Sequence, residues 1–190
     1  MAAASLIQSA LKTSANVHAA TARGQAKTIA QAAQAMIAAM KKGRKIIWFG
    51  NGGSATQSQH MAAEFVGRFS KDRRSLPSIS LTENIASVTA IANDYDYESI
   101  FARQLEGLAH RGDVAVGLST SGSSLNVLAA FHKAKAMGLT TIGLTSAKGA
   151  RMKASCDICI LVPSTTTARI QEVHLTIGHI LCELVEAALV

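Results

Sequence analysis

The sequence predicts an α/β fold in which a parallel sheet is covered on both faces by helices. Short apolar runs alternate with longer segments of helical periodicity, a pattern typical of strand–helix–strand units with right-handed crossovers. The chain has 190 residues, 48% hydrophobic and only 16% charged, which is enough apolar material for one substantial core. Two loops rich in glycine and hydroxyl groups follow predicted strands, and such loops form the ligand crevice of parallel sheets.

Five short apolar runs bounded by glycine, proline or polar residues are the predicted strands. They lie at 45–50, 77–82, 114–120, 140–145 and 156–163. The segments with helical spacing lie at 54–68, 84–92, 97–109, 124–137 and 168–189. Pro77 opens one strand and Pro163 closes another, and a strand tolerates a missing N–H at both positions.

The first 44 residues predict helices that precede an α/β core at 45–190, the whole forming one domain. One helical face of this segment is apolar, which indicates packing; it carries Ile29, Ala33, Met36, Ile37 and Met40. Seven cations precede Glu64, the first carboxylate, and twelve basic residues balance twelve acidic ones afterwards. The net charge of +7 therefore belongs to this segment. We expect it to pack between subunits, with its cations at the rim, and to bind neither nucleic acid nor membrane.

Hydropathy and cysteine content limit the class of protein to which the chain can belong. No run reaches the ~20 apolar residues of a membrane span, and the acid-poor N-terminus has too few arginines for a targeting peptide. Cys156, Cys159 and Cys182 cannot all pair within one chain, so we expect thiols that serve mainly as core residues in a reducing, cytoplasmic compartment. The spacing "CDIC" lacks a second pair for a four-cysteine zinc site, which leaves a metal or redox role as the minor alternative.

The stretch "STSGSS" at 119–124 places five hydroxyl groups around Gly122, directly after an apolar strand and before a helix. Free backbone N–H groups, the helix dipole and hydroxyl donors together favour a phosphate. The alternative is an ordinary helix cap with serines chosen for the turn. Neither this loop nor "GNGGSA" matches a nucleotide-binding motif.

His60 and Glu64 are four residues apart, which puts them on one helical face. This spacing suits a divalent metal or an acid–base pair, and a surface hydrogen bond is the alternative. The apolar C-terminal helix carries Gln171, His174 and His179, and His174 could be a hydrogen-bonded core histidine. Because Gln171 and His179 differ by about 12 Å along the axis, they share one ion only if both lean toward the middle. Otherwise they serve different subunits, or only one is a ligand.

Four blocks together identify a resemblance to the phosphoheptose isomerases of the sugar isomerase (SIS) superfamily, from about residue 45 to the C-terminus. They read "GNGGSA…QHMAAEF", "IANDYDY", "LSTSGSSLNVLAA" and "RIQEVHLTIGHILCELVE". The resemblance implies a five-stranded parallel three-layer sandwich and a homotetramer with active sites at subunit contacts. It also implies one zinc ion per subunit and a sugar phosphate substrate. The implied reaction converts sedoheptulose 7-phosphate to D-glycero-D-manno-heptose 7-phosphate for bacterial lipopolysaccharide precursors.

The same resemblance assigns site residues by position. Implied substrate contacts are Asn51, Gly52, Gly53, Glu64, Asn93, Asp94, Ser119, Thr120, Ser121, Ser124 and Gln171. Implied metal ligands are His60, Glu64, Gln171 and His179, with Glu64 and His179 also matching the catalytic acid and base. Two positions depart from the family pattern: Gln57 stands where many members have aspartate, and Ala168 where some do.

Two other functions compete with this one. A non-catalytic SIS relative that binds the bacterial replication initiator has a similar "RIQE" block but lacks the acid and the last histidine. Glu64 and His179 are both present in this chain, which favours the enzyme. Other SIS enzymes, such as amino-sugar phosphate isomerases and etherases, are generally longer or carry two SIS halves.

Overall fold

In the computed structural model, which describes residues 2–190, five strands form one parallel sheet in the order β2-β1-β3-β4-β5. They are β1 (Ile46–Gly50), β2 (Ser78–Ser80), β3 (Val114–Leu118), β4 (Thr140–Ser146) and β5 (Ile158–Val162). Each lies where the sequence predicts a strand, with ends that differ by at most two residues. The predicted parallel α/β fold is confirmed.

Seven helices are present among the described residues, and five of them follow the sequence prediction. They are α1 (Ala2–Lys41), α2 (Gly53–Val66), α3 (Ile85–Asp94), α4 (Ile100–Leu108), α5 (Leu125–Ala136), α6 (Ala150–Ser155) and α7 (Thr167–Leu189). The N-terminal segment is one continuous helix, so the expectation of several helices there is wrong. The sequence also missed α6, which has only six residues and is too short to show a helical period.

The sheet separates two apolar cores, as a three-layer sandwich requires. Alternate residues of β1 face opposite sides: Ile46 and Trp48 enter the core beneath α1, α2 and α7, while Ile47 and Phe49 enter the core beneath α4 and α5. Because both faces are covered, all five residues of β1 are buried. This explains why the strand reads as a continuous apolar run.

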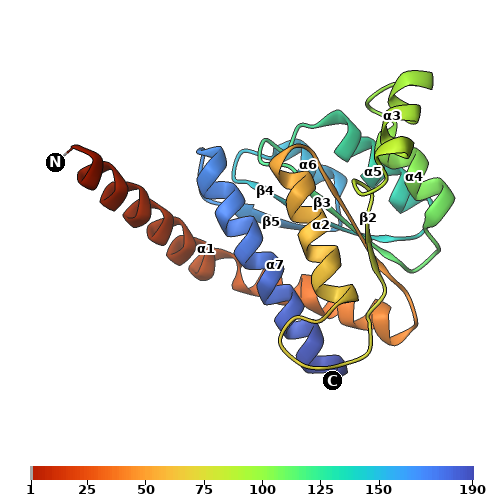
Figure 1. Ribbon diagram of the computed structural model, residues 1–190, viewed down its shortest axis with the longest axis horizontal. Helices are drawn as coiled ribbons and strands as arrows, with labels where there is room; N and C mark the ends of the chain where they lie inside the picture. The colour runs from red at the N-terminus through yellow and green to blue at the C-terminus, as the bar shows by residue number, and fades with distance from the viewer. Residues whose placement is uncertain (1) are drawn as a thin grey trace.

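Helix α1 joins the sandwich only through part of its length. Its C-terminal part packs into the core through Ile29, Met36 and Met40, while its first turns project away from the other elements (Figure 1). Leu6 and Leu11 on the projecting part are 71% and 66% exposed. The projecting part therefore offers apolar side chains that this chain does not cover.

Polar contacts fasten the middle of α1 to α7. Arg169 pairs with Glu172 at 2.7 Å, and the Ser14 hydroxyl donates to the other oxygen of Glu172 at 2.7 Å. His18 lies 3.0 Å from the Thr176 hydroxyl one turn further along. α1 thus runs beside α7, the helix that carries Gln171 and His179.

The described helices include none that is both long and apolar enough to cross a bilayer. The three cysteines are free thiols, and Cys156 and Cys182 are buried. This agrees with their predicted use as small core residues.

His174, on the sheet-facing side of α7, is 1% exposed, and in the described chain neither ring nitrogen has a hydrogen-bond partner. The expectation of a hydrogen-bonded core histidine is therefore wrong. Burial lowers the pKa of His174 from 6.5 to about 4, although the nearby Thr145 carbonyl opposes this shift. The buried ring is consequently neutral at pH 7.

This buried imidazole predicts an acid-sensitive fold. In the unfolded chain His174 is protonated below about pH 6.5, whereas in the folded chain it stays neutral down to about pH 4. The free energy of unfolding therefore falls as the pH drops through that range. We expect a loss of about 2 kcal/mol between pH 7 and pH 5. Urea unfolding at both values, in chelator, measures it. His174→Leu should remove most of this loss, and an equal loss in that variant would contradict the assignment.

Candidate functional site

The strand order places two polar loops side by side. The chain leaves β1 to form β2 on one side and later returns to form β3 on the other side of β1. The loops that follow β1 and β3 therefore meet at the point where the strand order reverses, which is where open parallel sheets bind ligands. These are the two loops that the sequence singled out.

The loop after β1 depends on its glycines. Gly52, the residue before α2, has a φ of 54°, a left-handed conformation that glycine adopts without strain. A Cβ on Gly53 would lie 2.6 Å from the amide nitrogen of Gln171, so the missing side chain admits that amide. The structure thus brings Gly53 and Gln171, two predicted substrate contacts, together.

Asn51 joins the two loops. Its side-chain amide and that of Asn126, at the start of α5, exchange two hydrogen bonds of 2.9 Å. The Tyr97 hydroxyl also donates to the Asn51 side-chain oxygen at 3.1 Å. Sequence reasoning proposed Asn51 but not Asn126 or Tyr97. Asn126 lies in the quoted block "LSTSGSSLNVLAA" and Tyr97 ends the quoted block "IANDYDY", so these two blocks were the available signals.

The hydroxyl loop is folded around its own serines. Ser119 is buried, and its hydroxyl lies 2.9 Å from that of Ser124 and accepts a 3.2 Å bond from the Gly122 N–H. Ser124 precedes α5, but its side chain makes no capping bond to that helix. This favours the phosphate interpretation over the helix cap, because the Ser124 hydroxyl turns inward to the loop.

A cavity of about 260 Å³ opens beside this loop. Thr120 and Ser121 line one side, and Ser146, Lys148 and Thr165 from the neighbouring strand ends line another. Lys148 adds a cation beside the hydroxyl groups, which favours an anion. Sequence reasoning missed Lys148, which follows β4 in a stretch that carries no recognisable motif.

The second part of the site lies between α2 and α7. His60 and Glu64 come from α2 and His179 from α7, and one ligand atom from each lies within 4.8 Å of the others. The two Nε2 atoms are 3.0 Å apart, and the His60 Nε2 is 3.4 Å from a Glu64 oxygen. The structure therefore joins the predicted helix-face pair to a histidine 119 residues away in the sequence.

Close helix packing makes this cluster possible. A Cβ on Gly178 would collide with the sulfur of Met61, so the glycine lets α7 approach α2 without displacing that buried side chain. A second contact between the helices lies at Gln171, two turns before His179 on α7. The Gln57 side-chain amide of α2 donates a 2.7 Å bond to the Gln171 backbone carbonyl. The aspartate that the resemblance implies at this position has no N–H to donate, so it could not make this contact between the helices.

The His60, Glu64 and His179 cluster fits a zinc ion. Two ligands about 2.0–2.1 Å from a tetrahedral zinc ion lie about 3.3 Å apart, close to the two distances above. Two imidazole nitrogens that face each other at 3.0 Å need a shared proton or a cation between them. The side chain of His60 is 45% exposed, so an ion can enter.

Gln171 lies outside this cluster. Its amide contacts Gly53, and Gly53 is seven residues, or about 10 Å, from His60 along α2. In this chain the Gln171 side chain is directed to the glycine loop. The geometry thus separates Gln171 from His179, one of the possibilities that their spacing left open.

Asn93 and Asp94 lie outside both the two polar loops and the cluster of His60, Glu64 and His179. They end α3, are exposed, and bond to each other at 2.9 Å. Within residues 2–190, neither side chain hydrogen-bonds to the loops after β1 or β3.

Comparison with known proteins agrees with this geometry. A family model described as SIS domain matches residues 4–146. Phosphoheptose isomerase of Nitratiruptor sp. is 57% identical over 150 residues, 79% of this chain and 80% of that protein. Its counterpart in Burkholderia pseudomallei is 50% identical over 159 residues, 84% and 81% of the two chains.

Solved structures give the same result. A phosphoheptose isomerase from Francisella tularensis has a TM-score of 0.94 at 34% identity, over 98% of this chain and all of that one (100%). The phosphoheptose isomerase from Neisseria gonorrhoeae has a TM-score of 0.91 at 33% identity, over 96% and 98%. On sequence and fold together, this chain belongs to the phosphoheptose isomerase family of SIS-domain proteins.

Proposed function

We propose that this protein is an aldose–ketose isomerase that converts sedoheptulose 7-phosphate to D-glycero-D-manno-heptose 7-phosphate. The observation that carries the proposal is the cluster of His60, Glu64 and His179 between α2 and α7. It supplies an acid, a base and a metal position, which is what proton transfer between adjacent carbons through an enediol requires. Glu64 and His179 are also the residues that a purely binding relative lacks.

In the proposed mechanism, Glu64 takes the proton from the hydroxyl-bearing carbon while His179 protonates the neighbouring carbonyl oxygen, which gives the enediol. His179 then takes the proton of the other enediol hydroxyl while Glu64 returns its proton to the former carbonyl carbon. One Glu64 oxygen faces His60 at 3.4 Å, and the other is available for the proton. Zinc held by His60, Glu64 and His179 would polarise the carbonyl oxygen. Gln171, Asn51 and the glycine loop would orient the sugar, and Asn93 and Asp94 would contact it from outside the two loops. Gln171 would become a fourth zinc ligand only by turning away from Gly53.

The first experiment compares Glu64→Gln and His179→Gln with an exposed carboxylate of α7 as control, Glu183→Gln. We expect each site variant to lose at least about a hundredfold in isomerase turnover, because one acid or base is worth 10² to 10⁴ in rate. Zinc content should fall in both, while Glu183→Gln keeps activity and zinc. The measurement follows the appearance of aldose phosphate from sedoheptulose 7-phosphate. Near-parental turnover of Glu64→Gln would contradict the mechanism.

We propose that Ser119, Thr120, Ser121 and Ser124 bind the substrate phosphate. The supporting features are the inward-facing hydroxyls of Ser119 and Ser124, 2.9 Å apart, and the neighbouring Lys148.

The double variant Ser119→Ala/Ser121→Ala tests this role. Each lost bond to a charged oxygen costs about 1.5–3 kcal/mol, so we expect the loss of two to raise KM by at least about a hundredfold. Ser155→Ala is the control and should leave KM unchanged, because the Ser155 hydroxyl bonds to the Arg151 carbonyl of its own helix, α6. An unchanged KM in the double variant would show that the loop serves only the turn.

We also propose that the protein is a cytoplasmic homotetramer with α1 between subunits. The projecting end of α1 exposes Leu6, Ile7 and Leu11. Helix α3 has no buried residue, and its first residue, Ile85, is 72% exposed. Such apolar surface is typical of oligomer contacts. The exposed side of His60 would then face a neighbouring subunit, in line with active sites at subunit contacts.

Sedimentation at micromolar concentration tests the assembly. We expect a tetramer for the native chain and smaller species for Leu6→Ser/Leu11→Ser, since that variant places polar groups in the contact. Lys12→Ser, a polar change on the same stretch, should stay tetrameric. A native monomer would contradict the proposal.

A further inference from the structure

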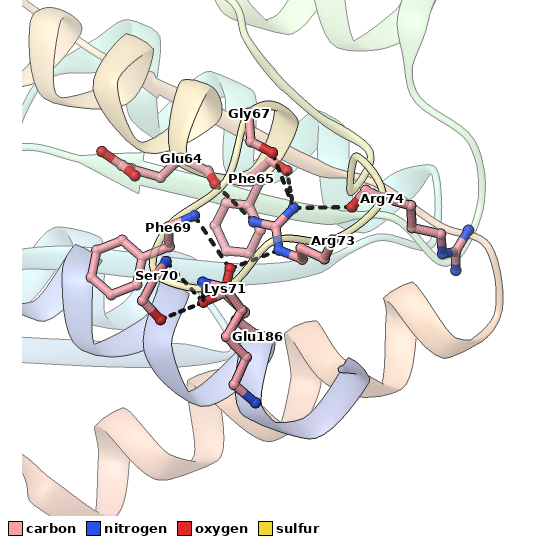
Figure 2. Close-up of polar contacts among 9 residues, drawn as sticks. All are labelled: Glu64, Phe65, Gly67, Phe69, Ser70, Lys71, Arg73, Arg74 and Glu186. Carbon is pink, nitrogen blue, oxygen red and sulfur yellow. Dashed lines mark hydrogen bonds and ion pairs between the residues drawn. The ribbon is translucent and has the colours of Figure 1, made fainter.

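The carboxylate of Glu186, near the end of α7, is almost completely buried, with 1% of its side chain exposed. Three successive backbone N–H groups, those of Phe69, Ser70 and Lys71, donate to it at 3.2, 2.9 and 2.9 Å. The Ser70 hydroxyl and the Arg73 Nε add bonds of 2.6 and 2.8 Å. Figure 2 shows the loop after α2 folded over this one carboxylate.

Arg73 joins the Glu186 carboxylate of α7 to the C-terminal end of α2. Its guanidinium donates to the carbonyl oxygens of Glu64 and Phe65, at 2.9 Å each, in the last turn of α2. The final carbonyls of a helix have no partner within the helix, and they form the negative end of its dipole. A buried cation at this position therefore caps α2 while it pairs with α7, and the Glu64 side chain points away from it (Figure 2).

The hydrogen bonds to the Glu186 carboxylate outweigh the free-energy cost of burying its charge. Although burial alone would raise the pKa of Glu186, the bonds from Ser70, Lys71 and Arg73 outweigh it and lower the pKa to about 2. The carboxylate is therefore ionised throughout the neutral range. A buried ion pair is a weak general source of stability, so its position is the more informative property.

That position is next to the candidate site. Glu186 follows His179 by seven residues, two turns along the same face of α7. Phe69, whose N–H binds Glu186, stacks on the His179 ring with centroids 5.7 Å apart and planes inclined by 30°. The ring of His179 thus contacts both Phe69 and His60, whose ring centroid is 5.2 Å away.

We propose that Glu186 and Arg73 are positioning residues that clamp the ends of α2 and α7 together and hold Phe69 against His179, which sets the spacing of the His60, Glu64 and His179 cluster. The inference rests on the proposed function, because it supplies the role of that cluster. Neither clamp residue touches the substrate. Their effect passes through the backbone of Glu64 and through Phe69.

The test compares Glu186→Gln with Asp113→Asn, which alters a second buried carboxylate of the same kind. Asp113 pairs with Lys45 at 2.6 Å and accepts the backbone N–H groups of Lys45 and His110, next to the amino ends of β1 and β3. Both variants should lower the melting temperature. Only Glu186→Gln should lower kcat and zinc affinity, by about 10- to 100-fold as for outer partners of metal ligands, with KM within twofold because the hydroxyl loop is intact.

A spectroscopic readout makes the test independent of zinc and of catalysis. In metal-free protein with labelled histidines, the His179 ring protons should carry the ring-current shift of stacked Phe69. Glu186→Gln should lose that shift, and Asp113→Asn should keep it. Retained shift, kcat and zinc affinity in Glu186→Gln would overturn the clamp, as would equal losses of all three in both variants.

Phe69→Leu keeps the proposal testable if Glu186→Gln does not fold, since it leaves the ion pair intact. We expect it to abolish the ring-current shift and lower kcat severalfold at a nearly unchanged melting temperature; unchanged kcat would overturn the role of Phe69. If His179→Gln leaves turnover and zinc binding intact, the proposed function fails. The ring-current comparison then still decides whether the clamp exists.

Discussion

The close approach of α7 to α2 is the contact on which the candidate site depends. A glycine at position 178 leaves room for the Met61 side chain against the backbone of α7, and the approach brings the Nε2 atom of His179 to 3.0 Å from that of His60. The two helices lie on the same face of the sheet (Figure 1), and contacts join them along their length. Gln57 bonds to Gln171 near their beginnings, and Glu186 binds the loop after α2 near their ends. A rigid pair of helices can hold three ligand atoms at the spacing that one ion needs.

The sheet supplies the second half of the arrangement. Because β1 and β3 are neighbours, the loops that follow them meet, and the paired amides of Asn51 and Asn126 join those loops directly. The hydroxyl groups and Lys148 gather on this edge, while the histidine cluster lies about 10 Å further along α2. The proposed anion site and the proposed proton-transfer site thus occupy separate positions on one scaffold. This division suits an extended sugar phosphate whose reacting carbons lie far from its phosphate.

Much of this follows from local sequence signals. The strands and the helices α2, α3, α4, α5 and α7 were predictable because apolar periodicity is strong in them, and the two loops because polar groups gather after apolar strands. The spacing of His60 and Glu64 correctly places them on one helix face. Sequence periodicity does not show the length of α1, since alanine-rich segments can form one helix or several, and it cannot show α6, which spans less than two turns.

Long-range contacts could not be predicted in this way. Nothing near His179 in the sequence reveals its distance from His60. The spacing of Gln171 and His179 left several arrangements open, and only the structure shows that the Gln171 amide lies against Gly53. Within residues 2–190, His174 lacks the hydrogen-bond partner that a buried polar group is expected to have. The pairing of Glu186 with Arg73 joins residues 113 apart in the sequence, and without the fold each reads as an ordinary charged side chain.

The most direct test of the account is a crystal structure grown with zinc, with diffraction data collected on both sides of the zinc absorption edge. The account predicts an anomalous peak between α2 and α7, at about 2.0–2.2 Å from a ring nitrogen of His60, a ring nitrogen of His179 and a carboxylate oxygen of Glu64. A peak elsewhere, or no peak between these helices in crystals soaked with excess zinc, would contradict it.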